Sequence, residues 1–165
     1  MSKFIAQVSV AHVPSFKKYV ASRTDMANLA RALGLQELWP YGVHNNYYYT
    51  DKSGVVALLP NLILKSNLYR VDKFTCINYA FKVWLECADR YELNTWVPVI
   101  GSVPGVVGMK HAWTLILLGD ESGIKQADCL YFEPNDGWAM GAELEAAYQA
   151  FPIGQLGYAG EKVFY

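Results

Sequence analysis

The fold of this chain of 165 residues is decided by the stretch Thr75-Cys76-Ile77-Asn78-Tyr79-Ala80-Phe81-Lys82-Val83-Trp84-Leu85-Glu86-Cys87-Ala88. Its apolar residues at helical spacing are Ile77, Ala80, Phe81, Trp84, Leu85 and Ala88. This stripe predicts an amphipathic helix that buries one side against a sheet. Either Thr75 or Asp72 can cap the helix, which places Cys76 in its first turn.

The rest of the chain carries both helix and strand patterns. A helix is predicted over residues 22–35, with Thr24 or Asp25 as its cap and Gly34 at its end. Pro60 interrupts the apolar stretch 54–64, which favours a helical turn or irregular packing there. The remaining predictions are strands at 47–49, 94–99, 111–118, 129–133 and 161–165, a polar connection at 119–128 and a short helix at 141–151. Helices that precede most of the strands indicate an α+β fold.

The composition is that of a globular protein with a large core. Hydrophobic residues make up 53% and aromatic residues 15%, and no linker rich in Pro, Gly or Ser divides the chain, so residues 1–165 are expected to form a single domain. A net charge of −1 gives no general attraction to nucleic acid or to an anionic membrane, and we expect neither as a partner. No apolar run reaches the ~18 residues that a membrane-spanning helix needs.

The cysteine count and the N-terminal residues indicate a compartment. Three cysteines are too few, and odd in number, for a disulfide framework. Residues 1–8 are interrupted by polar side chains and do not form a convincing secretory signal. The expected location is therefore the reducing cytoplasm, and a virus particle would have the same signature. The sequence leaves the oligomeric state open.

Three short segments carry residue types that act together in nucleophilic catalysis. Cys76 opens the helix described above, where unpaired N–H groups and the positive end of the helix dipole lower a thiol pKa. His111 opens an apolar strand and can take the proton of the thiol. Folding this strand back onto the next one places His111 opposite roughly Asn135, and Trp113 opposite roughly Glu133. Either Glu133 or Asn135 can then hold the imidazole by accepting its second N–H.

Ordinary structural roles account for the other candidates. A free cysteine is commonly a small buried residue, so Cys87 and Cys129 are expected in the core. Trp113 is expected to pack, or to wall a cleft. Asn67 and Asn78 are the nearest side-chain amides that could help to stabilise an oxyanion. Cysteine or histidine pairs with metal-ligand spacing are absent from the sequence, so no metal and no cofactor is expected.

The three segments together resemble a known group of proteins. They are the stretches from Tyr69 through Cys76 to Ala80, from Gly108 to Trp113 and from Tyr131 to Asn135. Cysteine, histidine and then an acid or amide, on helix, strand and strand, is the order of papain-like and transglutaminase-like folds. In detail the segments are similar to bacterial and phage proteins related to the C-terminal domain of the Marasmius oreades agglutinin.

The resemblance implies a papain-like α+β fold, in which a cysteine at a helix N-terminus packs on an antiparallel sheet. Because the agglutinin domain is a calcium-dependent cysteine protease, the resemblance also implies Cys76 as nucleophile, His111 as base and Glu133 as the residue that orients it. The acidic pair after the cysteine is replaced by Ile77 and Asn78 here, so calcium is not carried over. Nor is sugar binding, since no lectin domain is recognisable.

Three functions are consistent with these sequence features. The first is a thiol hydrolase that acts on a peptide, isopeptide or other amide bond of a peptide or protein substrate, with acyl transfer to an amine as a variant. The second is a non-catalytic binding or structural protein on the same scaffold, encoded by a phage and directed at a host protein. The third is a peptidoglycan amidase of the NlpC/P60 kind, which shares the residue order but usually has an export route.

Overall fold

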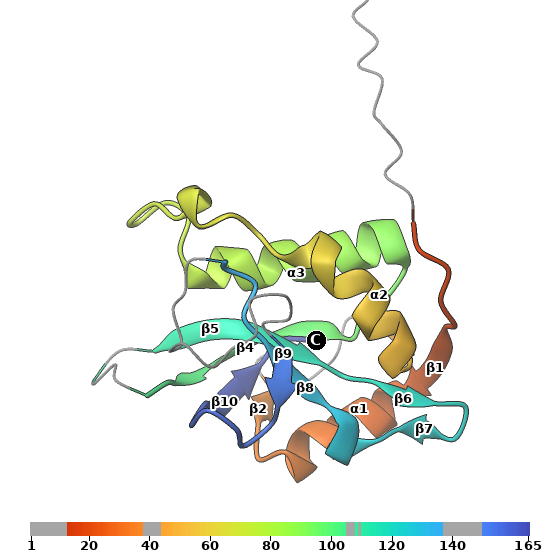
Figure 1. The fold of residues 1–165 in the computed structure, drawn as a ribbon. Helices are drawn as coiled ribbons and strands as arrows, with labels where there is room; N and C mark the ends of the chain where they lie inside the picture. The colour runs from red at the N-terminus through yellow and green to blue at the C-terminus, as the bar shows by residue number, and fades with distance from the viewer. Residues whose placement is uncertain (1–12, 38–43, 105–107, 109, 137–149) are drawn as a thin grey trace, which may run out of the picture.

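The computed structural model describes residues 13–37, 44–104, 108, 110–136 and 150–165. Most of its strands form one six-stranded sheet in the order β2-β10-β4-β5-β8-β9, antiparallel except where β2 meets β10 (Figure 1). The strands of this sheet are β2 (Gln36–Glu37), β4 (Trp96–Ser102), β5 (His111–Ile116), β8 (Leu130–Phe132), β9 (Ala150–Pro152) and β10 (Ala159–Val163). The described residues thus have the α+β class that the sequence predicts.

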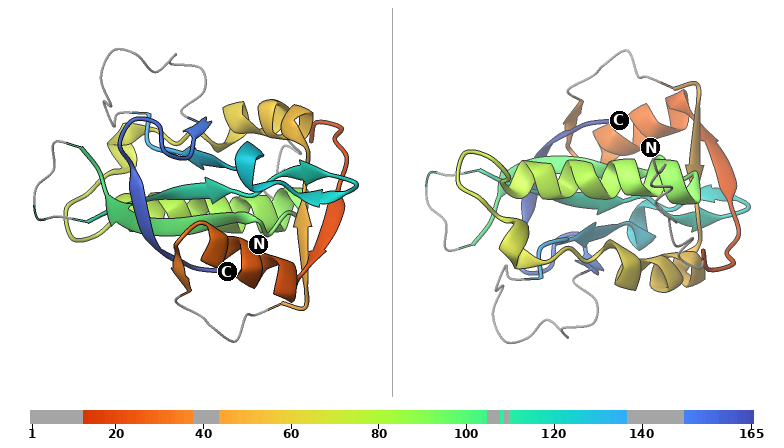
Figure 2. Two further views of the ribbon diagram at one scale, coloured as in Figure 1. Left: turned by 90° about the horizontal axis from the view of Figure 1, so that it is seen from below. Right: turned by 90° about the horizontal axis from the view of Figure 1, so that it is seen from above.

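Helices cover both faces of this sheet. They are α1 (Arg23–Ala32), α2 (Lys52–Leu62) and α3 (Cys76–Tyr91), with short 3-10 turns η1 (Ser66–Leu68) and η2 (Gln126–Asp128). α2 and α3 lie on one face and α1 on the other, as the views from above and below show (Figure 2). Each face has its own apolar cluster, so β4 and β5, in the middle of the sheet, are buried from both sides.

Two helix predictions need correction at their details. The N-cap of α1 is Ser22, whose hydroxyl accepts the Asp25 N–H at 3.2 Å while the Asp25 carboxylate accepts the Ser22 N–H at 2.9 Å. Asp25 completes this capping box from the first turn and does not occupy the cap itself. Of the two alternatives for the stretch around Pro60, the helical one is correct but too short, since α2 runs through Pro60 from a cap at Asp51.

The buried side of α3 also differs from the predicted stripe. The residues buried against the sheet and α2 are Tyr79, Ala80, Val83, Cys87 and Tyr91. Leu85, which the stripe includes, is 64% exposed, whereas Val83 is 1% exposed. Both rows of residues have helical spacing, because apolar side chains surround much of this helix. The position of the sheet beneath the helix decides which row is buried.

The strand predictions agree with the structure in the centre of the sheet. β5 and β8 form the expected antiparallel pair, with Thr114 opposite Phe132 and Ile116 opposite Leu130. The connection between them contains a small antiparallel pair, β6 (Gly119–Asp120) and β7 (Gly123–Ile124), which the sequence did not indicate.

The remaining predictions lie nearer the chain ends. The predicted strand at 47–49 is β3 (Asn46–Tyr49), and it pairs with β1 (Tyr19–Ser22), which was not predicted. The short helix expected at 141–151 falls mostly outside the described residues, and its last two residues belong to strand β9 instead. Residues 1–8, examined for a secretory signal, also lie outside them. None of the helices in the described ranges has the length and apolarity needed to cross a bilayer.

Candidate active site

Cys76 is the first residue of α3, and a local cap places it there. Thr75 is the N-cap residue, and its N–H donates to Oδ1 of Asn78 at 2.9 Å. Of the two caps that the sequence allowed, Thr75 is thus the one used, while Asp72 lies in the preceding turn with φ of 61°. The thiol is half-buried and accepts a hydrogen bond from the backbone N–H of Ile77. The sulfur therefore lies where free helix N–H groups are concentrated.

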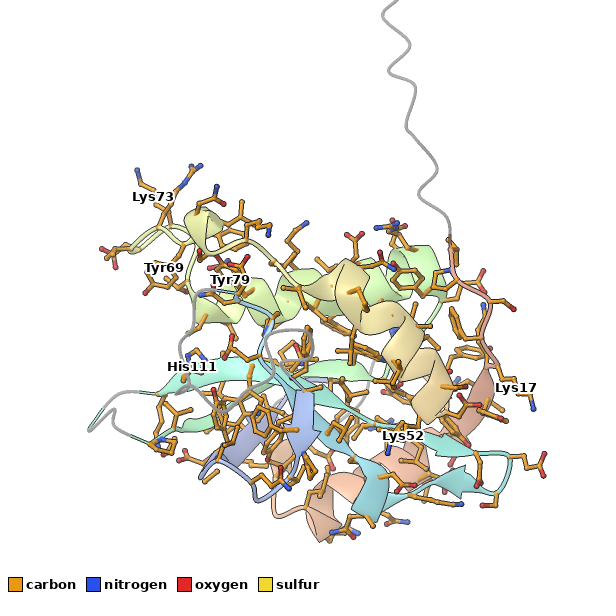
Figure 3. The ribbon with its side chains drawn as sticks, viewed as in Figure 1. Lys17, Lys52, Tyr69, Lys73, Tyr79 and His111 are labelled. Atoms are coloured by element: carbon orange, nitrogen blue, oxygen red, sulfur yellow. The ribbon has the colours of Figure 1, made fainter. Side chains whose placement is uncertain are left out.

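His111 is the first residue of β5 and lies beneath the N-terminal end of α3 (Figure 3). Its side chain is 4% exposed and forms a hydrogen bond with the Cys76 side chain. Nε2 of the same ring is 2.6 Å from Oε2 of Glu133. Because Glu133 engages Nε2, Nδ1 is the ring nitrogen left for the sulfur. The imidazole thus connects the thiol to a carboxylate.

Glu133 follows directly after β8 and is 1% exposed. Its Oε1 accepts the backbone N–H of Asn135 at 3.2 Å, and an interaction with the Tyr158 side chain helps to lower the pKa of the carboxylate. Of the two residues that the register placed near the imidazole, Glu133 contacts the ring nitrogen, and Asn135 supports Glu133 through its backbone. Asp136 instead forms an ion pair with Lys65 at 3.3 Å.

These contacts shift the pKa values of the thiol and the imidazole in opposite directions. Burial raises the pKa of Cys76, but the hydrogen bond and charge of His111, with the N–H groups of Ala112 and Ile77, bring it below its ordinary 9.0. Burial lowers the pKa of His111, but hydrogen bonds and charge from Cys76 and Glu133 raise it to about 9. Between these two pKa values a thiolate faces an imidazolium.

The Trp113 ring lies against the His111 imidazole. Its ring stacks on His111 with centroids 6.1 Å apart and 24° between the planes, and it is fully buried. This agrees with a packing role, and the contact restricts rotation of the imidazole.

Other residues considered from the sequence have structural roles or lie elsewhere. Asn78 caps α3, and Asn67 is an exposed residue of η1. Cys87 and Cys129 are buried, as expected, and burial raises the pKa of Cys129 to about 11 and that of Cys87 well above its ordinary value. Neither thiol is therefore a competing nucleophile at neutral pH.

Sequence reasoning missed two groups that contact the site. One is the backbone N–H of Ala112, which hydrogen-bonds the Cys76 sulfur. The other is Tyr158, which interacts with Glu133. Tyr158 precedes β10, and β10 is separated in the sheet from β8, the strand before Glu133, by β4 and β5. No local motif marks Tyr158, because its place beside Glu133 depends on how β10 joins the sheet. Spacing in the sequence carries no signal of that kind.

In the part of the chain that the structure describes, no group of three or more His, Cys, Asp or Glu side chains could hold a metal ion. No protein-family model matches the chain, and no curated protein matches its sequence. The geometry of the site and the order of its residues therefore carry the functional argument.

Proposed function

We propose that this protein is a thiol hydrolase that cleaves a peptide, isopeptide or other amide bond, with Cys76 as nucleophile, His111 as acid–base and Glu133 as the residue that orients the imidazole. The single observation that carries the proposal is that the His111 side chain contacts both Cys76 and Glu133. These three residues come from a helix, a strand and the end of another strand. Such a convergence of a thiol, an imidazole and a buried carboxylate fits a nucleophile, its base and the orienting group.

The reaction would proceed through a thioester. The Cys76 thiolate attacks the carbonyl carbon, and the free N–H groups at the start of α3 offer donors for the resulting oxyanion. The imidazolium of His111 protonates the leaving amine as the C–N bond breaks. Neutral His111 then takes a proton from water, which attacks the thioester and releases the acid. An amine in place of water would give acyl transfer.

The scaffold we propose is papain-like or transglutaminase-like. The order of cysteine helix, histidine strand and carboxylate after the next strand is that of these folds, and the antiparallel sheet under α3 is consistent with it. Similarity of the three segments to the group related to the agglutinin C-terminal domain supports the same assignment of roles. We propose no calcium ion, because Ile77 and Asn78 replace the acidic pair and Asn78 serves as a helix cap.

The test is turnover by wild-type protein and by two alanine variants. The substrates are a mixture of peptides from a bacterial lysate, read by mass spectrometry for new termini or new amide bonds, and purified peptidoglycan. We expect peptide products from the wild type and from Cys129→Ala, and none from Cys76→Ala. Equal turnover by Cys76→Ala, or no product from the wild type, would remove the proposal. Release of peptidoglycan fragments alone would favour the amidase of the cell-wall kind.

One observation favours a second candidate, a binding or structural protein without catalysis. His111 and Glu133 are almost fully buried and the thiol is only half-exposed, which suits a structural network as well as a catalytic one. A host protein captured equally by wild type and Cys76→Ala, with no turnover by either, would support this candidate.

A further inference from the structure

We propose that Tyr158 is a positioning residue, which holds the Glu133 carboxylate against the His111 imidazole. This inference rests on the proposed function, since it assigns a residue to the same site. Its action would pass through Glu133 and His111.

The Glu133 carboxylate is removed from water. It is 1% exposed, and burial raises its pKa above the ordinary value. Such a group needs hydrogen-bond donors to keep its charge and its orientation. Three groups partly offset this rise in pKa: the His111 imidazole, the backbone N–H of Asn135 and the side chain of Tyr158. Of these groups, only the Tyr158 hydroxyl can be removed by a substitution that leaves the imidazole unchanged.

The ring of Tyr158 is itself fixed beside the His111 imidazole. Its centroid is 6.4 Å from that of His111, with 73° between the planes. The same ring packs edge-on against Trp113 at 4.8 Å and Phe151 at 4.9 Å. Aromatic pairs in this arrangement are attractive, so the hydroxyl is aimed by a rigid cluster.

The backbone turn that precedes Tyr158 is tightly constrained. Three residues of the turn between β9 and β10 have positive φ, at 89° for Gly154, 55° for Leu156 and 69° for Gly157. A Cβ at Gly157 would lie 2.7 Å from the Pro104 side chain. This tight turn directs Tyr158 back onto the sheet immediately before β10 begins.

The chain offers a matched control for the missing hydroxyl. Tyr131 is also buried in this cluster, with its ring 6.5 Å from that of Tyr158. Its hydroxyl hydrogen-bonds the backbone of Gly160, however, and not Glu133. Tyr131→Phe and Tyr158→Phe therefore remove the same atom from the same cluster and differ in its partner.

The experiment compares these two variants with the wild type in turnover and in the His111 imidazole titration, followed by NMR. We expect Tyr158→Phe to lower kcat about 10-fold with KM unchanged, as the loss of one hydrogen bond to a charged group implies. We also expect the His111 pKa to fall from its wild-type position, because the carboxylate that stabilises the imidazolium is less well held. Tyr131→Phe should change neither quantity, and thermal unfolding of both variants checks that they fold.

A double-mutant cycle completes the test. In a Glu133→Gln background, Tyr158→Phe should have no further effect on the His111 titration, because its route through the carboxylate is gone. An equal effect with and without Glu133, or identical behaviour of Tyr158→Phe and Tyr131→Phe, would overturn the inference. The titration does not require turnover, so it tests Tyr158 even if the wild type cleaves nothing, whereas absent turnover removes the proposed function alone.

Discussion

Nε2 of His111 and Oε2 of Glu133 lie 2.6 Å apart, although His111 opens β5 and Glu133 follows the end of β8. The pairing of Thr114 with Phe132 accounts for this proximity. Because β5 and β8 run antiparallel, the residues that follow Phe132 run alongside the residues that precede Thr114. Trp113 stacks on the imidazole at the same place. The ring is thus held by a carboxylate on one nitrogen and by an aromatic face, and its other nitrogen is directed at the thiol.

Glu133→Gln should lower kcat by about 100-fold or more, because the neutral amide does not stabilise the imidazolium and does not fix its tautomer. The measurement is steady-state turnover on a peptide that the wild type cleaves. Glu161→Gln is the control, since this exposed carboxylate pairs with Lys110 away from the imidazole. Equal losses in both variants would argue against a special role for Glu133.

The pH dependence of turnover should follow the titration of the Cys76 thiol and the His111 imidazole. The pKa of Cys76 lies below its ordinary 9.0 and that of His111 at about 9, so turnover should rise with pH through the former and fall through the latter. Alkylation of Cys76 by iodoacetamide at pH 7 should accordingly be faster than that of a thiol with the ordinary pKa. In His111→Ala the thiol loses its hydrogen bond and its positive neighbour, so its pKa rises and alkylation at pH 7 should slow about 10-fold.

Cys129→Ala provides the control for this labelling. Cys129 is buried and its pKa is raised to about 11, so its removal should leave the rate and its pH profile unchanged. A wild-type profile that coincides with that of His111→Ala would contradict the ion pair.

The buried side of α3 can be tested by two truncations on one helix. Val83→Ala should lower the free energy of unfolding by about 2 kcal/mol, because a side chain packed against the sheet is replaced by a cavity. Leu85→Ala removes a larger side chain from a solvent-exposed position and should cost less than about 0.5 kcal/mol. Urea unfolding of the two variants measures both values. The reverse order would mean that the stripe read from the sequence is the buried one.

Asn78→Ala should destabilise the protein by about 1 kcal/mol through loss of the cap at the start of α3. Thermal or urea unfolding measures the change. Asn67→Ala is the comparison, because this amide is exposed in η1 and the substitution should be close to neutral. If Asn78→Ala left stability intact but abolished turnover, Asn78 would instead belong to the chemistry, as the sequence had allowed.

Local patterns were sufficient for the parts of this protein that depend on near neighbours. The helix that begins at Cys76 follows from an apolar repeat and a Thr75 cap, both of which act within a few residues. The proximity of Glu133 to His111 follows from folding one apolar strand onto the next, where a period of two leaves few registers that bury both. These two features were enough to bring forward Cys76 and His111, with Glu133 or Asn135, as one candidate site.

Tertiary packing decided what sequence spacing leaves open. Two rows of α3 have helical periodicity, and the sheet selects the one containing Val83, because only a side chain that meets a partner surface gains from burial. The turn before β10 brings Tyr158 to Glu133. Short strands such as β1 and β9 form because they pair with segments far away in the sequence. Such contacts join residues far apart in the chain, so the short-range patterns that predict a helix or a hairpin do not contain them.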